Sequence, residues 1–351
     1  MDQRAAGRIR RDLGDLVDAG LQAAAFCAAA GPLVARAVPT AAGAAATPTW
    51  YSLDPGSLLI NGVYGPDCTL DGAAQMRWEY LDNDVNKSIE VARNPFGVQT
   101  LAEVTGGNPW RSAIYRDYMR DHDLAQEMVV ALRDEAGQLW ATVRLNRPAA
   151  MPAFDESDRQ FMRSVAPLLA EGIRRGLLAG TGSATPSPGA PGLVIVDPAG
   201  LPIAVSATAR EWLALFPDGP ASAGGLPLPL YAVSFATLAG GSPAGPLHLR
   251  LANGQWAALY GVETEMAQPG SAGVIIGPAD HAHLAPLTAA IFGLTPRELQ
   301  VAELVVRGWA TQRMAHMLGI SPYTAQEHLR HIFGKVGVAS RGELVAALFL
   351  E

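Results

Sequence analysis

Apolar residues recur at helical spacing in four short runs within residues 294–351. Thr295 and Glu298 form a capping box before the first run. Ser321 precedes the third run as a candidate cap, and Pro322 suits the first helical position, where no N–H is required. This pattern predicts an all-α unit of four helices with a tight turn between the second and the third.

Glycines and a second capping box indicate where these helices end and begin. Gly308 is predicted to close the first helix in a left-handed conformation, and Gly319 is predicted to end the second. Ser340 with Glu343 predicts the start of the fourth helix. A helix-turn-helix of this plan is typical of DNA-binding proteins.

The third predicted helix has two different sides. The side expected to pack on the other helices carries Ala325, His328, Leu329 and Ile332. On the opposite side, Gln326 suits adenine, Glu327 suits cytosine N4, and Arg330 suits guanine. The alternative is an ordinary charged surface helix, and Glu327 repels phosphates unless a cytosine or an arginine lies beside it.

Other groups of the same segment are candidates for phosphate contacts. Helix starts and cations favour phosphate oxygens because the N–H groups and positive charges point toward them. These candidates are Thr311, Thr324, Lys335, Arg341 and, below neutral pH, His331.

At this point the motifs resemble a known family. LTPRE at 294–298, the run 315–321, TxxxHL at 324–329 and KxGVxSRxEL at 335–344 are similar to the LuxR-type C-terminal helix-turn-helix. The resemblance spans nearly all of residues 290–349. It implies that the third helix enters the major groove and that the fourth helps two copies dimerise.

Two departures from the family pattern change these expectations. Ala310 replaces the usual small hydroxyl residue before the second helix, so the cap is expected to pass to Thr311 or to be weaker. Ala325–Gln326 replaces the usual Val–Lys pair, which removes one positive charge. Residues 294–351 contain six Lys and Arg and five Asp and Glu, which gives a net charge of +1. Because the whole chain has a net charge of −7, residues 1–293 have a net charge of −8. Because phosphate neutralisation drives affinity, a homodimer on half-sites about 10 bp apart is expected.

The first half of the chain predicts a mixed α and β domain over residues 1–178. Strands are expected at 50–53 and 58–63, and a hairpin is expected where MVVALRD and LWATVRL flank EAGQ. Asp155 is expected to cap a long closing helix. The Arg- and Ala-rich start predicts an amphipathic helix and not a secretion signal, because aspartates interrupt it.

The middle of the chain predicts a second domain over residues 193–282. Residues 179–192 contain only Ala, Gly, Ser, Thr and Pro, which predicts a flexible linker. A hairpin, a helix capped by Ser206 or Thr208, a hairpin at Asn253–Gly254 and a last strand follow. Residues 283–293 are expected to form a connecting helix.

These two domains resemble sensor modules. The element order of 1–178 and its FDESD ending are similar to a GAF domain, and YLDNDVNKS with TGGNPWRS resembles actinobacterial-type LuxR regulators. The order in 193–282 is similar to a PAS domain. The predicted fold is therefore multidomain, with α+β sensor domains (GAF-like, then PAS-like) followed by the all-α LuxR-type domain at 294–351.

Candidate effector residues are aromatic or cationic. Aromatic rings supply apolar area and polar atoms to pockets, and an arginine suits an anion. The candidates are Trp78, Tyr80, Trp110, Arg111 and Tyr115, although core packing explains the rings and a surface ion pair explains the arginine equally simply. Asp82 and Asp84 are expected in a solvated turn.

The sequence excludes several classes of chemistry. No Walker A, G-x-S-x-G, HExxH or Cys/His cluster is present, so no catalytic site, metal or cofactor is expected. Cys27 and Cys68 lack metal spacing and suggest a reducing cytoplasm, and oxidant sensing by Cys68 is a remote alternative. The predicted function is a cytoplasmic, dimeric regulator that binds promoter DNA, does not associate with membranes and responds to a small-molecule effector or a partner. The alternative is a dimerisation or protein-interaction module without a small-molecule ligand.

Overall fold

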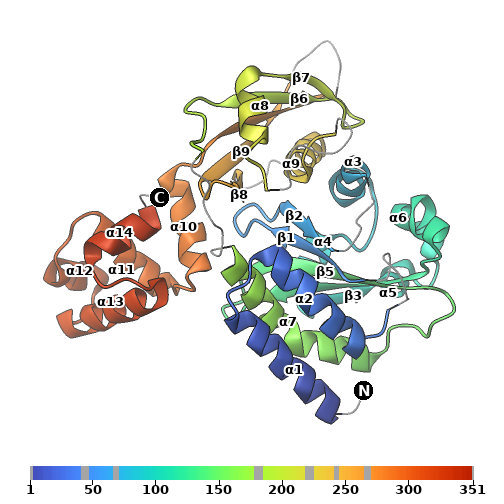
Figure 1. The fold of residues 1–351 in the computed structure, drawn as a ribbon, viewed down its shortest axis with the longest axis horizontal. Helices are drawn as coiled ribbons and strands as arrows, with labels where there is room; N and C mark the ends of the chain where they lie inside the picture. Colours follow the sequence, from blue (N-terminus) through green and yellow to red (C-terminus); the bar gives the residue numbers. More distant parts are fainter. Residues whose placement is uncertain are drawn as a thin grey trace. The chain divides into compact units, whose positions relative to one another are not determined.

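The computed structural model describes residues 3–40, 47–65, 71–177, 185–217, 225–240, 245–264 and 270–349. The chain forms two compact units, Met1–Pro278 and Ala279–Glu351. The first unit contains two five-stranded antiparallel sheets, and the second is formed by helices (Figure 1). The expected combination of α+β and all-α parts is confirmed.

Sheet A organises the first lobe, residues 3–177, and has the strand order β2-β1-β5-β4-β3. The predicted strands and hairpin are confirmed, since β1 pairs antiparallel with both β2 and β5 and β4 pairs antiparallel with β5. The strands are β1 Thr49–Leu53, β2 Ile60–Tyr64, β3 Val98–Thr100, β4 Gln126–Arg133 and β5 Leu139–Arg147.

Three long helices pack on one another, and α7 packs on one face of sheet A. They are α1 Gln3–Asp18, α2 Ala23–Ala37 and α7 Glu156–Gly176. Ile9, Leu13 and Val17 are buried at spacings of four, which confirms an amphipathic first helix. Asp155 caps α7 as predicted, by accepting a hydrogen bond from Asp158 N–H. Among the described helices, none is both long and apolar enough to span a bilayer.

Short helices cover the opposite face of sheet A. A π-helix, η2, follows α3 directly, and α4 packs on β4 and β5. Their bounds are α3 Gly72–Met76, η2 Arg77–Leu81, α4 Ser88–Arg93, α5 Leu101–Thr105, η3 Pro109–Arg111, α6 Ala113–Asp117 and η4 Met119–His122.

Sheet B organises the second lobe, residues 185–278, with the order β7-β6-β10-β9-β8. Its hairpins lie where the sequence predicts them, and Ser206 caps α8 by accepting from Ala209 N–H. The elements are β6 Gly192–Val196, β7 Pro202–Val205, α8 Ala207–Leu213, α9 Leu228–Leu238, β8 Leu247–Arg250, β9 Trp256–Glu263 and β10 Ala272–Pro278.

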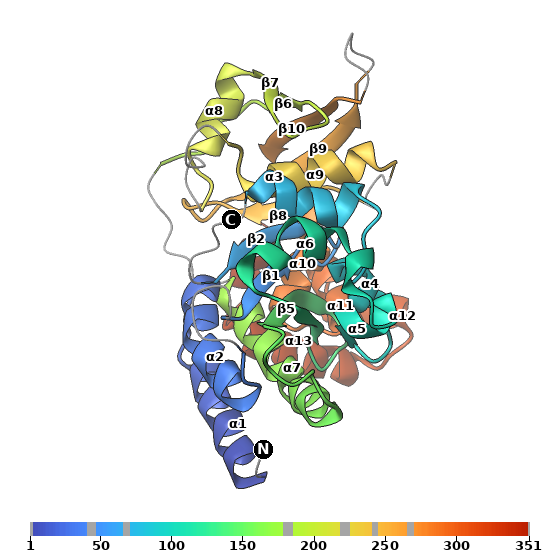
Figure 2. The same cartoon turned by 90° about the vertical axis from the view of Figure 1, so that its right-hand side faces the viewer.

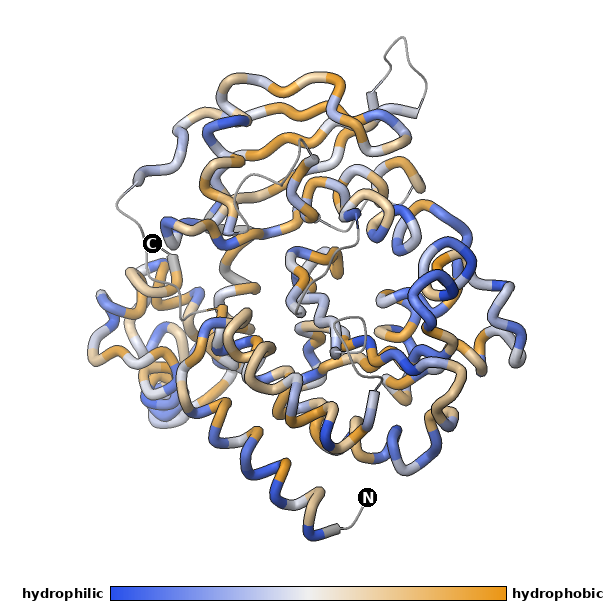
Figure 3. Tube along the Cα trace, turned by 45° about the vertical axis from the view of Figure 1, so that its right-hand side comes forward, coloured by the Kyte–Doolittle hydropathy of each residue, from blue (hydrophilic) through white to orange (hydrophobic). Residues whose placement is uncertain are grey.

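Helix α9 joins the two lobes, and the sequence did not predict it. Its residues are nearly all buried, because it packs on β9 and β10 on one side and on β2, η2 and α3 on the other (Figure 2). One hydrophobic core therefore includes Ile60 of β2, Phe235 of α9 and Val274 of β10. The strands of sheet B are mainly hydrophobic along their length (Figure 3).

The described part of the predicted linker, residues 185–191, contacts the rest of the second lobe. Asn253 Nδ2 donates to Thr185 O at 2.9 Å, and Trp212 Nε1 donates to Ala190 O at 3.0 Å. Strand β6 begins at Gly192, next to the predicted end of the linker.

The second unit begins with α10 and continues into four helices. The bounds are α10 His281–Ile291, α11 Pro296–Val306, α12 Thr311–Leu318, α13 Pro322–Val336 and α14 Arg341–Phe349. All four predicted helices are present. Thr295 and Ser321 cap α11 and α13, and Gly308 has a φ of +73°, as predicted. Gly319 ends α12 as predicted and also has a positive φ, +63°. The core of the unit includes Val301, Met314, Leu329, Ile332 and Leu344.

Candidate DNA-binding surface

Helix α13 separates a buried side from an exposed polar side. Ala325, Leu329 and Ile332 are buried, and α13 packs on α11 and α12, as the sequence predicts. His328, which was predicted for the same side, is only half-buried. Gln326 and Arg330 are exposed, and Glu327 is half-buried. Because the cap at Ser321 fixes where the helix begins, it also fixes which side chains point away from the core.

Tyr323 extends this polar side by one turn, and the sequence interpretation missed it. It lies three and four residues before Gln326 and Glu327, so it shares their face, and it is 76% exposed. A tyrosine supplies a hydroxyl and an apolar ring, which suit a phosphate or a thymine methyl. The spacing of three and four residues in the sequence could have placed Tyr323 on this face. We call Tyr323, Gln326, Glu327 and Arg330 the α13 face.

An ion pair lies within the α13 face. Arg330 Nη2 donates to Glu327 Oε2 at 2.8 Å, with the two residues one turn apart. The arginine therefore neutralises the carboxylate that would otherwise repel phosphates. The pair is partly exposed, so it is weak and can be exchanged for contacts with a base.

The small hydroxyl candidates lie at helix starts. Thr324 is exposed, and its hydroxyl lies 2.8 Å from Ser321 Oγ at the start of α13. Thr311 is the first residue of α12, and the cap position before it, Ala310, makes no side-chain hydrogen bond. His331 is exposed on α13.

The two cationic side chains predicted to contact phosphates already make hydrogen bonds to other groups of the second unit. Lys335 Nζ donates to Glu298 Oε2 at 2.7 Å and to Gly293 O at 2.9 Å. Arg341 donates to Trp309 O at 2.9 Å and to Thr311 Oγ1 at 2.7 Å. Both side chains thus hold helices together, and a phosphate contact must use their remaining N–H donors.

The Lys335 ion pair changes the ionisation of Glu298. Burial raises the pKa of Glu298, but Lys335 and the N–H of Thr295, which donates at 2.7 Å, outweigh burial. The pKa therefore lies below its ordinary value, and Glu298 stays ionised as both the capping-box residue of α11 and the partner of α13.

The five candidate effector residues lie in separate environments. Tyr80 accepts a hydrogen bond from Ile60 N–H at 2.8 Å, and Trp78 donates to Asp117 at 3.4 Å. Trp110 is exposed and packs edge-on against Tyr115, with 5.5 Å between ring centroids. Arg111 donates to Thr105 O at 3.3 Å. Their role in effector binding stays a prediction.

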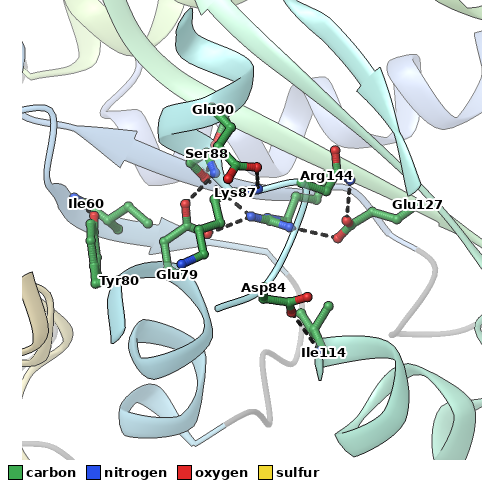
Figure 4. A network of polar contacts seen from close by, with 12 residues as sticks. Ile60, Glu79, Tyr80, Asp84, Lys87, Ser88, Glu90, Ile114, Glu127 and Arg144 are labelled. Carbon is green, nitrogen blue, oxygen red and sulfur yellow. Dashed lines mark hydrogen bonds and ion pairs between the residues drawn. The ribbon is translucent and has the colours of Figure 1, made fainter. Parts of the chain in front are cut away.

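A buried network of charged side chains fills the space between sheet A and η2 (Figure 4). Arg144 of β5 donates to Glu127 of β4 at 2.8 Å and to Glu79 of η2 at 2.7 Å. Glu79 also accepts from Ser88 N–H, and Glu127 accepts from Asn86 Nδ2 at 2.6 Å. Two carboxylates share one guanidinium, and burial raises the pKa of Glu79 despite Arg144. A cavity of only about 20 Å³ remains beside the network, about the space of one water.

The prediction of a solvated turn is wrong for Asp84. Its side chain is 5% exposed and accepts from Ala113 N–H at 2.8 Å and Ile114 N–H at 2.9 Å, at the start of α6. These partners lie about 30 residues along the chain, so local polarity misled the prediction.

A larger cavity, of about 960 Å³, lies elsewhere in the first unit. Its lining includes Cys27, Trp50, Asn61, Arg250 and Trp256. Burial raises the pKa of the Cys27 thiol, which keeps it protonated and unreactive. Cys68 lies outside the described residues.

Comparison with known proteins identifies the second unit. Residues 293–348 match the family model for bacterial regulatory proteins of the luxR family. A putative HTH-type transcriptional regulator in the exeN 3′ region of Aeromonas salmonicida is 47% identical over 51 residues, 14% of this chain and 26% of that protein. The putative HTH-type transcriptional regulator Mb0914c of Mycobacterium bovis is 46% identical over 52 residues, 15% of this chain and 6% of that protein. The transcriptional regulatory protein UhpA of Escherichia coli is 41% identical over 56 residues, 16% of this chain and 29% of that protein.

These matches span less than a third of each relative's length. Among solved structures, the phage VqmA–DPO complex is 20% identical, with 45% of this chain and 79% of that chain covered and a TM-score of 0.23. The E. coli DhaR(N)–DhaL complex is 14% identical, with 80% and 91% covered and a TM-score of 0.24. TM-scores this low do not establish a common fold. The helix caps, the α13 face and the family match agree on one conclusion: residues 293–348 are a helix-turn-helix domain of the LuxR family.

Proposed function

We propose that this protein regulates transcription by placing the α13 face in the major groove of promoter DNA. The observation that carries the proposal is that Gln326, Glu327 and Arg330 project from the side of α13 opposite its buried residues. Gln and Arg are the side chains that pair bidentately with adenine and guanine. Relatives of this domain are named transcriptional regulators, which supports the same function.

We propose that the protein binds DNA as a dimer. From Leu294 onward the net charge is only +1, and Lys335 and Arg341 already donate to groups inside the unit. Few positive charges remain for phosphates, and two copies on adjacent half-sites double both the base contacts and the phosphate contacts.

The first unit is proposed to control promoter occupancy by binding an effector. The cavity of about 960 Å³ supports this, because it is as large as the pockets that hold drug-sized molecules. An effector shifts the protein toward one state only if it binds that state more tightly. A thermal-shift screen tests this step, because a true ligand raises the unfolding temperature as its concentration passes its Kd.

The alternative is an interaction module that responds to a protein and needs no small molecule. The filled space beside Arg144 favours it, because that part of the first lobe has room for about one water. A protein of this second kind gives no concentration-dependent thermal shift with small molecules.

DNA binding is tested by selecting fragments from a genomic library and measuring the affinity of the full chain for the selected site and a scrambled site. Gln326→Ala and Arg330→Ala are each expected to lower the preference for the selected site by about 1–3 kcal/mol. Gln300→Ala is the matched control, because Gln300 is an exposed glutamine on α11, outside the α13 face. A chain with no sequence preference, or variants that leave the preference unchanged, contradict the proposal.

A further inference from the structure

One face of sheet B is apolar and open to solvent. Successive residues of a strand point to opposite faces. Helices α8 and α9 cover one face, since a Cβ at Gly192 would meet Ala209 of α8 and a Cβ at Gly261 would meet Thr237 of α9. The other face carries the alternate positions of the same strands.

The strand register aligns the apolar side chains of this second face in rows. Leu193 of β6 lies beside Ile275 of β10, which lies beside Tyr260 of β9. In the next row, Ile195 lies across Gly273 from Val262. The open face is defined by these residues and by Ala204 of the neighbouring edge strand, which pairs with Ile195: Leu193, Ile195, Ala204, Tyr260, Val262 and Ile275.

Two of these side chains are more exposed than large apolar residues usually are. Leu193 is 40% exposed and Tyr260 36%. Scattered exposed apolar residues are ordinary, but a contiguous group on one face marks an interaction surface. At the β8 end the same face is already covered, because Arg250 donates to Leu177 O at 2.5 Å and His248 Nδ1 lies 3.3 Å from Asp54.

The geometry points to a second copy of this chain as the molecule that covers the open face. In a two-fold dimer the same patch meets itself, so any net charge on it would repel its own copy. The described positions of the open face on β6, β7, β9 and β10 carry no charged side chain. A neutral, apolar face is self-complementary, whereas a partner of opposite charge would need a charged surface.

The edge of the sheet indicates face-to-face and not edge-to-edge pairing. The outermost strand, β7, has four residues and begins with Pro202, which lacks an N–H donor. Short strands and proline both disfavour addition of a further strand. The partner copy therefore stacks on the side chains of the open face.

This interface deepens the proposed function and rests on its dimeric part. Strand β10 ends at Pro278, and α10 of the second unit begins at His281. The link spans at most about 10 Å. Pairing through sheet B therefore restricts where the two helix-turn-helix domains can lie relative to each other, which is what recognition of two spaced half-sites requires.

The test is the mass of the full chain in solution, measured by light scattering after size exclusion over a range of concentrations. The wild type is expected to be dimeric. Leu193→Glu and Tyr260→Glu are each expected to raise the Kd of the dimer at least about tenfold, because like charges then meet in the interface. Both sites are partly exposed, so the glutamates reach water in the monomer.

Phe96→Glu is the matched control, because Phe96 is 69% exposed on the first lobe, outside the open face. It is expected to leave the dimer unchanged. Leu193→Gln removes apolar contact without adding charge, so it still tests the interface if a glutamate variant does not fold, and it is expected to weaken the dimer less. Circular dichroism verifies the fold of each variant.

Two results would overturn this interface. A monomeric wild type removes it together with the dimeric part of the proposed function. A dimer that all three open-face variants leave intact removes the interface alone. Base recognition is tested separately, by the affinity of Gln326→Ala and Arg330→Ala for the selected DNA site. A failure of base recognition can therefore be distinguished from a monomeric wild type and from a dimer with a different interface.

Discussion

In the second unit, charged side chains lie at helix starts and on the exposed α13 face, whereas in the first lobe three of them meet in the interior. Thr295 and Glu298 cap each other across three residues. Arg144 and Glu79 lie 65 residues apart and form their ion pair away from water. The hydrogen bonds that cap a helix join residues close in sequence, whereas the ion pairs of the buried network form only when the fold brings distant residues together. Their loss should therefore have very different consequences.

The largest expected effect comes from removing the centre of the buried network. Arg144→Met leaves Glu79 and Glu127 without their shared cation, so the free energy of unfolding is expected to fall by about 3–5 kcal/mol. Urea denaturation followed by tryptophan fluorescence measures it, since Trp50 and Trp140 are buried in the first lobe.

Arg120→Met is the control for Arg144→Met. Arg120 pairs with Asp121 on the surface, where both side chains are about half-exposed, and its loss is expected to lower the free energy of unfolding much less than the loss of Arg144. Equal effects of the two variants would contradict the contrast between buried and exposed charges.

Helix caps in the second unit are expected to have intermediate effects, in both directions. Ser321→Ala removes the acceptor for Thr324 N–H and is expected to destabilise the unit by about 1 kcal/mol. Ala310→Ser should stabilise it by about 0.5–1 kcal/mol. The reason is that Ala310 has φ −70° and ψ 152°, almost the angles of Ser321, and only its cap oxygen is missing. Hydrogen exchange of the α12 and α13 amides measures both changes, and a loss of protection on Ala310→Ser is incompatible with this explanation.

The smallest expected effect is a change in pH dependence at Glu298. Its pKa is lowered in the folded unit, so its contribution to stability is present above the ordinary value of 4.5 and is lost as pH falls through the lowered value. Glu298→Gln should therefore flatten the acid side of the stability curve of the second unit. Glu303→Gln, on the same helix, is the control. An acid limb that Glu298→Gln leaves unchanged would refute the assignment.

The sequence predicted most of what depends on neighbouring residues. The caps at Thr295, Ser321 and Asp155 and the hairpins of both sheets form between residues only a few positions apart, so their signals lie within one short window. The two sides of α13 follow from spacing alone, and the same spacing applied one turn earlier predicts Tyr323.

What the sequence did not predict depends on distant contacts. Asp84 looked like part of a solvated turn because its partners at 113 and 114 are remote in the chain. Helix α9 was missed because it is apolar on all sides and shows no helical period, which reflects its burial between sheet B and the elements of the first lobe. Arg144, Glu79 and Glu127 come from β5, η2 and β4, and only the folded sheet brings them together.

The hydrogen bonds of Arg341 have a consequence for the order in which the protein is made. This residue starts α14 and holds the turn before α12, through Trp309 O and Thr311 Oγ1. Residues 296–336 therefore leave the exit tunnel of the ribosome before the group that fixes their turn does. The nascent second unit lacks this contact until residue 341 has left the exit tunnel, and chains truncated before that point should be the ones that proteases remove.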